Sequence, residues 1–128
     1  MLKIVTYNGE NKDATFYVQS HGNNAGRPLK QPIPNCFAIY TNKENAFEIV
    51  YALWIGKAFY QFIGGTAIPF IKIKHVKNIL SSFFAKDYNP KHLEAIQSVS
   101  NLIEIQKKTI TQYEDLRRVL ARQAMKAN

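Results

Sequence analysis

The chain has 128 residues, enough for one compact domain and too few for two domains with separate cores. Hydrophobic residues make up 46% of it and charged residues 20%, a balance that excludes a disordered chain. Seventeen Lys and Arg stand against nine Asp and Glu, so the net charge is +8 and acidic partners such as nucleic acid are favoured. A single cysteine excludes an internal disulfide, and no segment has the length of a signal peptide core or a membrane span. We therefore expect a cytoplasmic protein that does not enter a membrane.

The first 40 residues are predicted to form short strands. Residues 2–7 and 14–19 flank a polar turn, which predicts a β-hairpin. Residues 20–35 contain two Gly, three Pro and three Asn, which favour turns and predict a long surface loop. The apolar run CFAIY at 36–40 is bounded by turn residues and is typical of a buried strand.

A helix is expected next. Thr41 and Glu44 have the spacing of a capping box, which predicts a helix from about Asn42. Apolar residues then recur every three or four positions, and Trp54 falls on the inward face. Two consecutive glycines at 64 and 65 predict the end of this helix.

Residues 67–74 are predicted to be extended because Pro69 cannot lie within a helix. In an extended segment Phe70, Lys72 and Lys74 would share one face. A short helix over residues 75–86 is expected to follow.

The last helix is predicted to begin at Asn89 as N-cap and Pro90 as first residue, and to end near Ala124. Its length of roughly 50 Å exceeds what a domain of this size needs to cover its own core. Apolar side chains follow a heptad that Gln106 and Arg117 interrupt, and a second apolar stripe lies beside it. We therefore expect a partner helix, from a second copy or another protein, to pack on Ile96, Ile103, Ile110, Tyr113 and Leu120.

Together these elements predict an α+β fold. A small antiparallel or mixed sheet packs against one amphipathic helix, and a long C-terminal helix follows. Residues 1–88 are expected to form the α+β domain, and residues 89–128 a packing or dimerisation element.

Catalytic and metal-binding motifs are not evident. Gly56-Lys57 lacks the first Gly and the Ser/Thr of a phosphate-binding loop, and the three histidines have no metal-ligand spacing. Cys36 with His21 as a base is conceivable as a nucleophile pair, but a cysteine in an apolar run usually packs in a core. We therefore expect no enzyme, no metal and no cofactor.

The basic residues are the more informative group. Seven cations stand against two carboxylates between Arg27 and Lys77. Such a surface can follow a phosphate backbone, although lysines at a strand edge also guard against aggregation. The predicted phosphate contacts are Arg27, Lys30, Lys57, Lys72, Lys74 and Lys77.

Part of the chain resembles a known family. The strand-like NCFAIYTN, the segment 46–63, the run Gly65-Thr66-Ala67-Ile68-Pro69 and the short basic segment at 75–79 stand in the order found at the end of a target recognition domain. Such domains belong to the specificity subunits of type I restriction and modification enzymes. The helix after Pro90 resembles their spacer helix, which docks on methyltransferase subunits. The whole chain also resembles small uncharacterised proteins of Bacteroidetes and their mobile elements.

The resemblance implies DNA binding without catalysis. The leading hypothesis is therefore a non-enzymatic module that binds double-stranded DNA by its basic face and pairs through its last helix. The alternative is a protein-interaction module of a mobile element that mimics or intercepts a specificity subunit and does not bind DNA.

Overall fold

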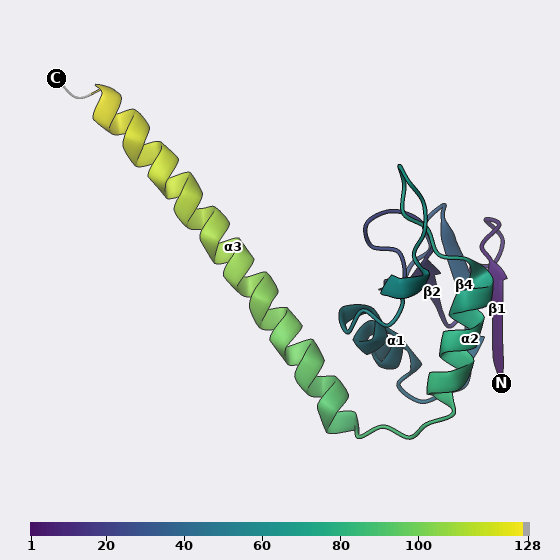
Figure 1. Ribbon diagram of the computed structural model, residues 1–128. Helices are drawn as coiled ribbons and strands as arrows, with labels where there is room; N and C mark the ends of the chain where they lie inside the picture. Colours follow the sequence, from purple (N-terminus) through teal and green to yellow (C-terminus); the bar gives the residue numbers. More distant parts are fainter. Residues whose placement is uncertain (127–128) are drawn as a thin grey trace. The chain divides into compact units, whose positions relative to one another are not determined.

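The fold is α+β, as predicted. The computed structural model describes residues 1–126, and the chain divides into two compact units, residues 1–93 and the remainder. The elements are β1 (Leu2–Thr6), β2 (Phe16–Gln19), β3 (Pro28–Leu29), β4 (Cys36–Thr41), α1 (Ala46–Ile55), the 3₁₀ turn η1 (Tyr60–Phe62), α2 (Ile73–Phe84) and α3 (Pro90–Lys126) (Figure 1). No helix among residues 1–126 is both long and apolar enough to cross a membrane.

The four strands form one antiparallel sheet in the order β1-β4-β2-β3. The predicted hairpin is wrong, because β1 and β2 each pair with β4 and not with each other; Ile39 lies between Ile4 and Phe16. Residues 8–13 instead close a turn of their own, in which the Glu10 amide donates to Asn8 Oδ1 at 2.9 Å. The most apolar strand, β4, thereby takes a central position.

The segment predicted as a long loop contains β3, which pairs with β2 at the edge of the sheet. Pro28 is tolerated there because an edge strand leaves one side without ladder partners. This short strand brings the basic residues on either side of it close to α1.

Both faces of the sheet carry buried apolar residues. One face, with Ile4, Val18 and Ile39, packs on apolar residues of α1 and α2. The other face carries a smaller cluster around Tyr17 and Cys36. One helix was expected to pack on the sheet, but two do so. Besides α1, the helix α2 contributes Val76, Ile79 and Leu80 to the core.

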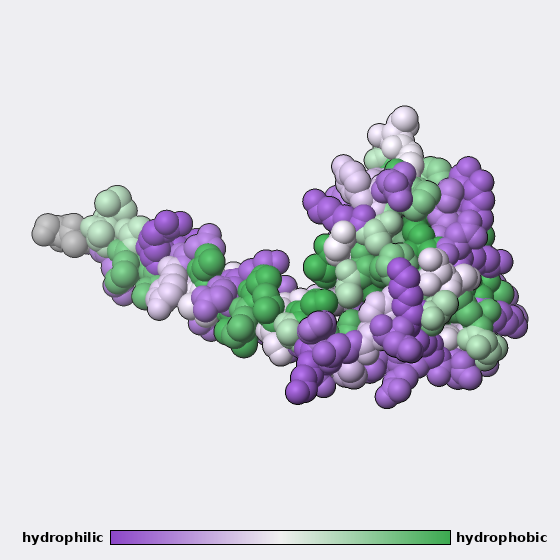
Figure 2. Space-filling model, turned by 60° about the horizontal axis from the view of Figure 1, so that its bottom comes forward, coloured by the Kyte–Doolittle hydropathy of each residue, from purple (hydrophilic) through white to green (hydrophobic). Residues whose placement is uncertain are grey.

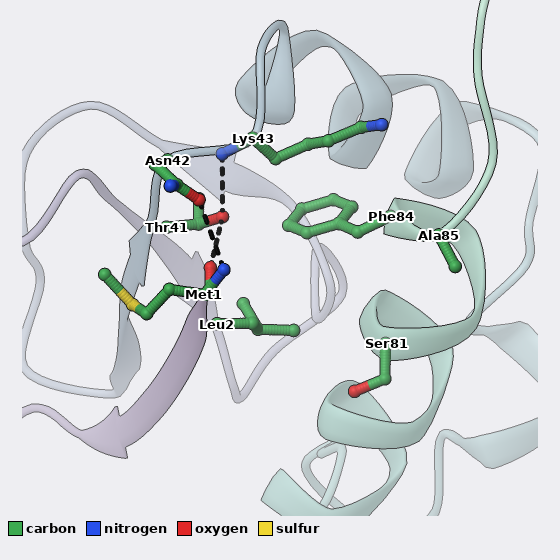
Figure 3. A pocket seen from close by; sticks show the side chains of 8 residues that line it. All are labelled: Met1, Leu2, Thr41, Asn42, Lys43, Ser81, Phe84 and Ala85. Atoms are coloured by element: carbon green, nitrogen blue, oxygen red, sulfur yellow. Dashed lines mark hydrogen bonds between the residues drawn. The ribbon is translucent and has the colours of Figure 1, made fainter.

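The predicted capping box at the start of α1 does not form. Thr41 Oγ1 donates to the Met1 carbonyl at 3.0 Å and accepts from the Lys43 amide at 3.1 Å (Figure 3). The hydroxyl therefore holds the beginning of the chain against the end of β4. The helix begins at Ala46, after Asn45 in the left-handed conformation (φ 58°).

The same helix ends earlier than predicted, at Ile55, and not near residue 63. Lys57 adopts a positive φ of 62°, and Phe59 then turns into the core, where it is 1% exposed. Burial of this ring accounts for the break, because a continued helix would have followed its own axis past the core.

The predicted extended segment 67–74 is partly wrong, since α2 already begins at Ile73. Residues 66–68 bend, and only residues 69–71 lie along residues 20–22: the Ile71 amide donates to the Ser20 carbonyl at 2.9 Å. Beyond this anchor the apolar spacing of three and four residues favours a helix.

The predicted start of α3 is confirmed. Asn89 Oδ1 accepts from the Lys91 amide at 3.0 Å, as an N-cap does, and Pro90 is the first helical residue. Leu93 is buried in the core of the first unit, and the helix continues to Lys126.

Candidate nucleic-acid interface

The six residues predicted to contact phosphates fall into two groups, and all six are exposed. Arg27, Lys30 and Lys57 lie beside α1, whereas Lys72, Lys74 and Lys77 lie at the start of α2.

In the first group each cation lies over an aromatic ring. The guanidinium carbon of Arg27 is 5.6 Å from the centroid of the Trp54 ring, and Lys30 Nζ is 5.4 Å from that of Phe47. Phe47 and Trp54 are seven residues apart, so they lie two turns apart on one face of α1. Because Arg27 and Lys30 flank β3, the strand sets them beside these two rings.

Lys57 extends this group past the end of α1. Its Nζ lies 5.8 Å from the centroid of Tyr60, which is 70% exposed. Lys57, Tyr60 and Trp54 also line a shallow hollow of about 340 Å³ with Asn23. We call Arg27, Lys30 and Lys57, with the rings of Phe47, Trp54 and Tyr60, the aromatic edge.

These contacts have a physical consequence for the cations. A ring face attracts a positive charge and also covers the apolar stem of the side chain. A cation held in this way loses less conformational freedom when an anion binds to it. The aromatic edge is therefore preorganised for anionic partners.

The second group is the α2 lysines, Lys72, Lys74 and Lys77. The predicted placement of Lys72 and Lys74 on one face of an extended segment is wrong: Lys72 is the N-cap residue, and Lys74 lies on the helix. Lys77 lies on the same helix, where a helix was expected. Lys74 and Lys77 are three residues apart and therefore neighbours on the helix surface. Phe70, expected on the same face as the lysines, stacks on His21 with ring centroids 6.0 Å apart.

No acidic residue lies near the α2 lysines in the sequence. Residues 49–86 contain five Lys and no Asp or Glu. The two ion pairs that the structure shows within residues 1–126, Lys107–Glu104 and Arg118–Asp115, both lie in α3. Cations in the first turn of a helix also face the positive end of its dipole, so this arrangement costs stability unless an anion is bound.

Comparison with known proteins gives a family without a function. Residues 4–123 match the model described as "Family of unknown function (DUF6943)". The chain belongs to this family. No curated protein and no solved structure matches it. The likeness to restriction and modification specificity subunits therefore stays a hypothesis.

In this DUF6943 chain the conceivable nucleophile, Cys36, lies in the smaller apolar cluster and is 1% exposed. Its thiol donates to the Ile33 carbonyl at 3.0 Å, and burial raises the pKa of the thiol. His21 Nδ1 lies 2.8 Å from Ser20 Oγ. These contacts support a packing role for Cys36, because a nucleophile requires the thiolate.

Within residues 1–126 no three His, Cys, Asp or Glu side chains come together as a metal site would need.

The sequence analysis did not predict the rings beside the cations of the aromatic edge, because it placed Trp54 on the inward face of its helix. Trp54 is half-buried, and one side of it meets Arg27 and the hollow. The two residues are 27 positions apart, so no local spacing predicts their contact. The sequence around β3, Arg27-Pro28-Leu29-Lys30, does not alternate between apolar and polar residues and therefore gives no strand signal.

Proposed function

We propose that the chain is a non-enzymatic module that binds double-stranded DNA through the aromatic edge and the α2 lysines. The run of 38 residues, 49–86, with five lysines and no carboxylate is the observation that carries this proposal. Phosphates are the partners whose charge and spacing suit such a surface.

The two groups would serve different parts of the contact. The α2 lysines supply mobile charges beside a helix N-terminus, which attracts phosphate oxygens. The aromatic edge supplies Arg27, whose planar guanidinium can donate two hydrogen bonds to one phosphate while it lies over the Trp54 ring. Such contacts position a duplex and do not read its sequence.

The resemblance to a target recognition domain supports the same function. In that family DNA is bound without catalysis by the domain itself. The present chain keeps the order of segments on which that resemblance rests, and two of the proposed phosphate contacts, Lys57 and Lys77, lie on those segments.

The test is the fluorescence anisotropy of a labelled mixed-sequence duplex, titrated at several salt concentrations. We expect affinity to fall linearly in log salt, and Lys74→Glu with Lys77→Glu to lower the slope by about two, or about one per lysine. Acidic residues near the start of α2 favour the helix, so unfolding would not explain the loss.

The matched control is Lys3→Glu with Lys12→Glu, which changes the net charge equally. Lys3 lies over the Tyr40 ring, on the sheet face away from α1 and α2. Equal losses in the two double variants would show that only total charge matters and would reject the proposed face.

A second candidate is an interaction module that does not contact DNA. The observation in its favour is α3, whose large apolar residues are exposed. No DNA binding at low salt, with assembly through α3 retained, would make it the leading function.

A further inference from the structure

From Val99 onward, the large apolar side chains of α3 are exposed to solvent. Ten large apolar residues between 99 and 125 have exposed fractions of 47% to 83%, and Figure 2 shows apolar side chains along the helix. Of the described residues in α3, Leu93 is the buried one. Most helical stability in proteins comes from packing of an apolar face, and an apolar surface this extended marks an interface.

The apolar residues follow a heptad whose two interruptions are symmetric. Positions spaced alternately by three and four are Ile96, Val99, Ile103, Gln106, Ile110, Tyr113, Arg117, Leu120 and Ala124. Gln106 and Arg117 break this apolar seam, and both lie at the same distance from the midpoint between Thr111 and Gln112. A two-fold axis through that midpoint would bring each against the other.

We propose that α3 pairs with α3 of a second copy as an antiparallel coiled coil, with its two-fold axis between Thr111 and Gln112. In this register Ile110 faces Tyr113 of the second copy, and Ile103 faces Leu120. Val99 faces Ala124 in the layer outside these. Every one of these layers joins an a position to a d position, as antiparallel packing of two heptads requires.

The polar residues select this register. Here the Arg117 guanidinium can donate to the side-chain oxygen of Gln106 of the second copy, so each polar residue has a hydrogen-bonding partner in the seam. A shift of one heptad in either direction would place Arg117 against Val99 or Tyr113. A parallel pair in register would place two Arg117 guanidinium groups together in the seam, where like charges repel strongly.

Charges beside the seam agree with the same arrangement. At the flanking e positions Lys107 lies next to Glu114 of the second copy, and symmetry makes this pair twice. In the single chain Lys107 lies 3.6 Å from Glu104, but both side chains are about two-thirds exposed. That weak pair leaves Lys107 able to bridge to Glu114. In a parallel pair Lys107 would instead flank Leu102, without an ion pair.

The second apolar stripe is divided by this pairing. Leu102 and Leu116 lie at g positions beside the seam and widen the buried surface. Ile105 and Val119 lie at c positions on the outer side of the pair. Leu102 and Leu116 should therefore become buried in the dimer, whereas Ile105 and Val119 should stay exposed, although all four belong to one stripe in the sequence.

Light scattering and disulfide trapping test the proposal. Light scattering on the unmodified chain should give a dimer, and a monomer at tens of micromolar would overturn the proposal. For trapping, Cys36→Ala removes the one native cysteine, and Ile103→Cys and Leu120→Cys are made separately in that background. Oxidation should link the two variants only when they are mixed, because residue 103 faces 120.

Each single variant serves as its own control. In the antiparallel pair the two copies of residue 103 are separated by about 26 Å, so neither variant should dimerise covalently when oxidised alone. Covalent dimers of Ile103→Cys alone would show a parallel pair and overturn the proposal. A dimer whose mixture does not crosslink would overturn the register.

A charge exchange tests the flanking pair without cysteines. Lys107→Glu should weaken the dimer several-fold, and Lys107→Glu with Glu114→Lys should restore it. Lys108→Glu makes the same charge change on the outer side of the helix and should have little effect. Equal weakening by the two single variants would contradict the predicted contact. None of these outcomes depends on DNA binding.

Discussion

Two glycines in the first unit, Gly65 and Gly9, differ in whether a Cβ atom could be added. Gly65 has a φ of +98°, and a Cβ there would clash with the Ile68 carbonyl oxygen. The turn from Gly64 to Phe70 is closed by two backbone hydrogen bonds of 2.9 and 3.0 Å, so the carbonyl cannot move freely. Gly9 has a similar φ of +89°, but a Cβ at that position would meet nothing within 4 Å. Comparing the two glycines therefore distinguishes the free-energy cost of a positive φ from the cost of a steric clash.

Gly65→Ala should therefore destabilise the protein more than Gly9→Ala does. Both variants carry the cost of a left-handed residue, about 1 to 2 kcal/mol, and only the first adds a collision. Urea denaturation of the two variants measures the free energies of unfolding. Equal losses would show that the turn at 64–70 relaxes around a methyl group.

At the scale of elements, α1 and α3 differ in what stabilises them. The buried residues of α1, Ile49, Val50 and Leu53, pack into the core, so tertiary contacts support a helix of ten residues. The first turn of α3 is held by Leu93 in the same core. The rest of α3 has no such support within the described chain, and its helicity should therefore depend on association.

Ile103→Asp with Ile110→Asp should abolish assembly and lower the helical signal in circular dichroism. Charges in the seam face apolar residues of the second copy, so the paired state loses stability while the core of residues 1–93 is untouched. Light scattering and far-ultraviolet circular dichroism measure the two effects, and Trp54 fluorescence reports on the first unit.

The control for that variant is Ile105→Asp with Val119→Asp, which makes equally polar changes on the outer stripe. It should leave the dimer intact. If it dissociates the dimer as fully as the first variant does, the second stripe and not the heptad is the interface.

For the whole molecule, DNA binding and antiparallel pairing of α3 together predict how far apart the two DNA-binding units of a dimer begin. In the antiparallel pair the Leu93 residues of the two copies lie about 55 Å apart, given 37 residues at a rise of 1.5 Å. Each marks the boundary of one basic unit, residues 1–93, whose eleven Lys and Arg stand against five Asp and Glu. A dimer would thus offer two separate phosphate-binding surfaces.

A long duplex should consequently bind the dimer more tightly than a short one. A duplex of about 40 base pairs can engage both units, whereas one of about 12 engages a single unit, and linked binding raises affinity through effective concentration. Anisotropy titrations with the two duplexes measure the gain, which the Ile103→Asp, Ile110→Asp variant should lose. A gain that persists in that variant would show that the two units do not act through α3.

Several features follow from residues close together in the chain. The start of α3 at Asn89 and Pro90, the strand at 36–41 and most of α2 depend on capping, apolar runs and a period of three or four residues. These signals act over one or two helical turns, so they survive whatever the rest of the chain does.

The remaining features depend on contacts between distant segments. The Thr41 hydroxyl donates to the Met1 carbonyl where a capping box was expected, β4 separates the two expected hairpin strands, and Phe59 enters the core just past the end of α1. The aromatic edge likewise joins Arg27 to Trp54. In each case burial or a long-range hydrogen bond outweighs a local preference of about 1 kcal/mol, and such contacts form only when the whole fold closes.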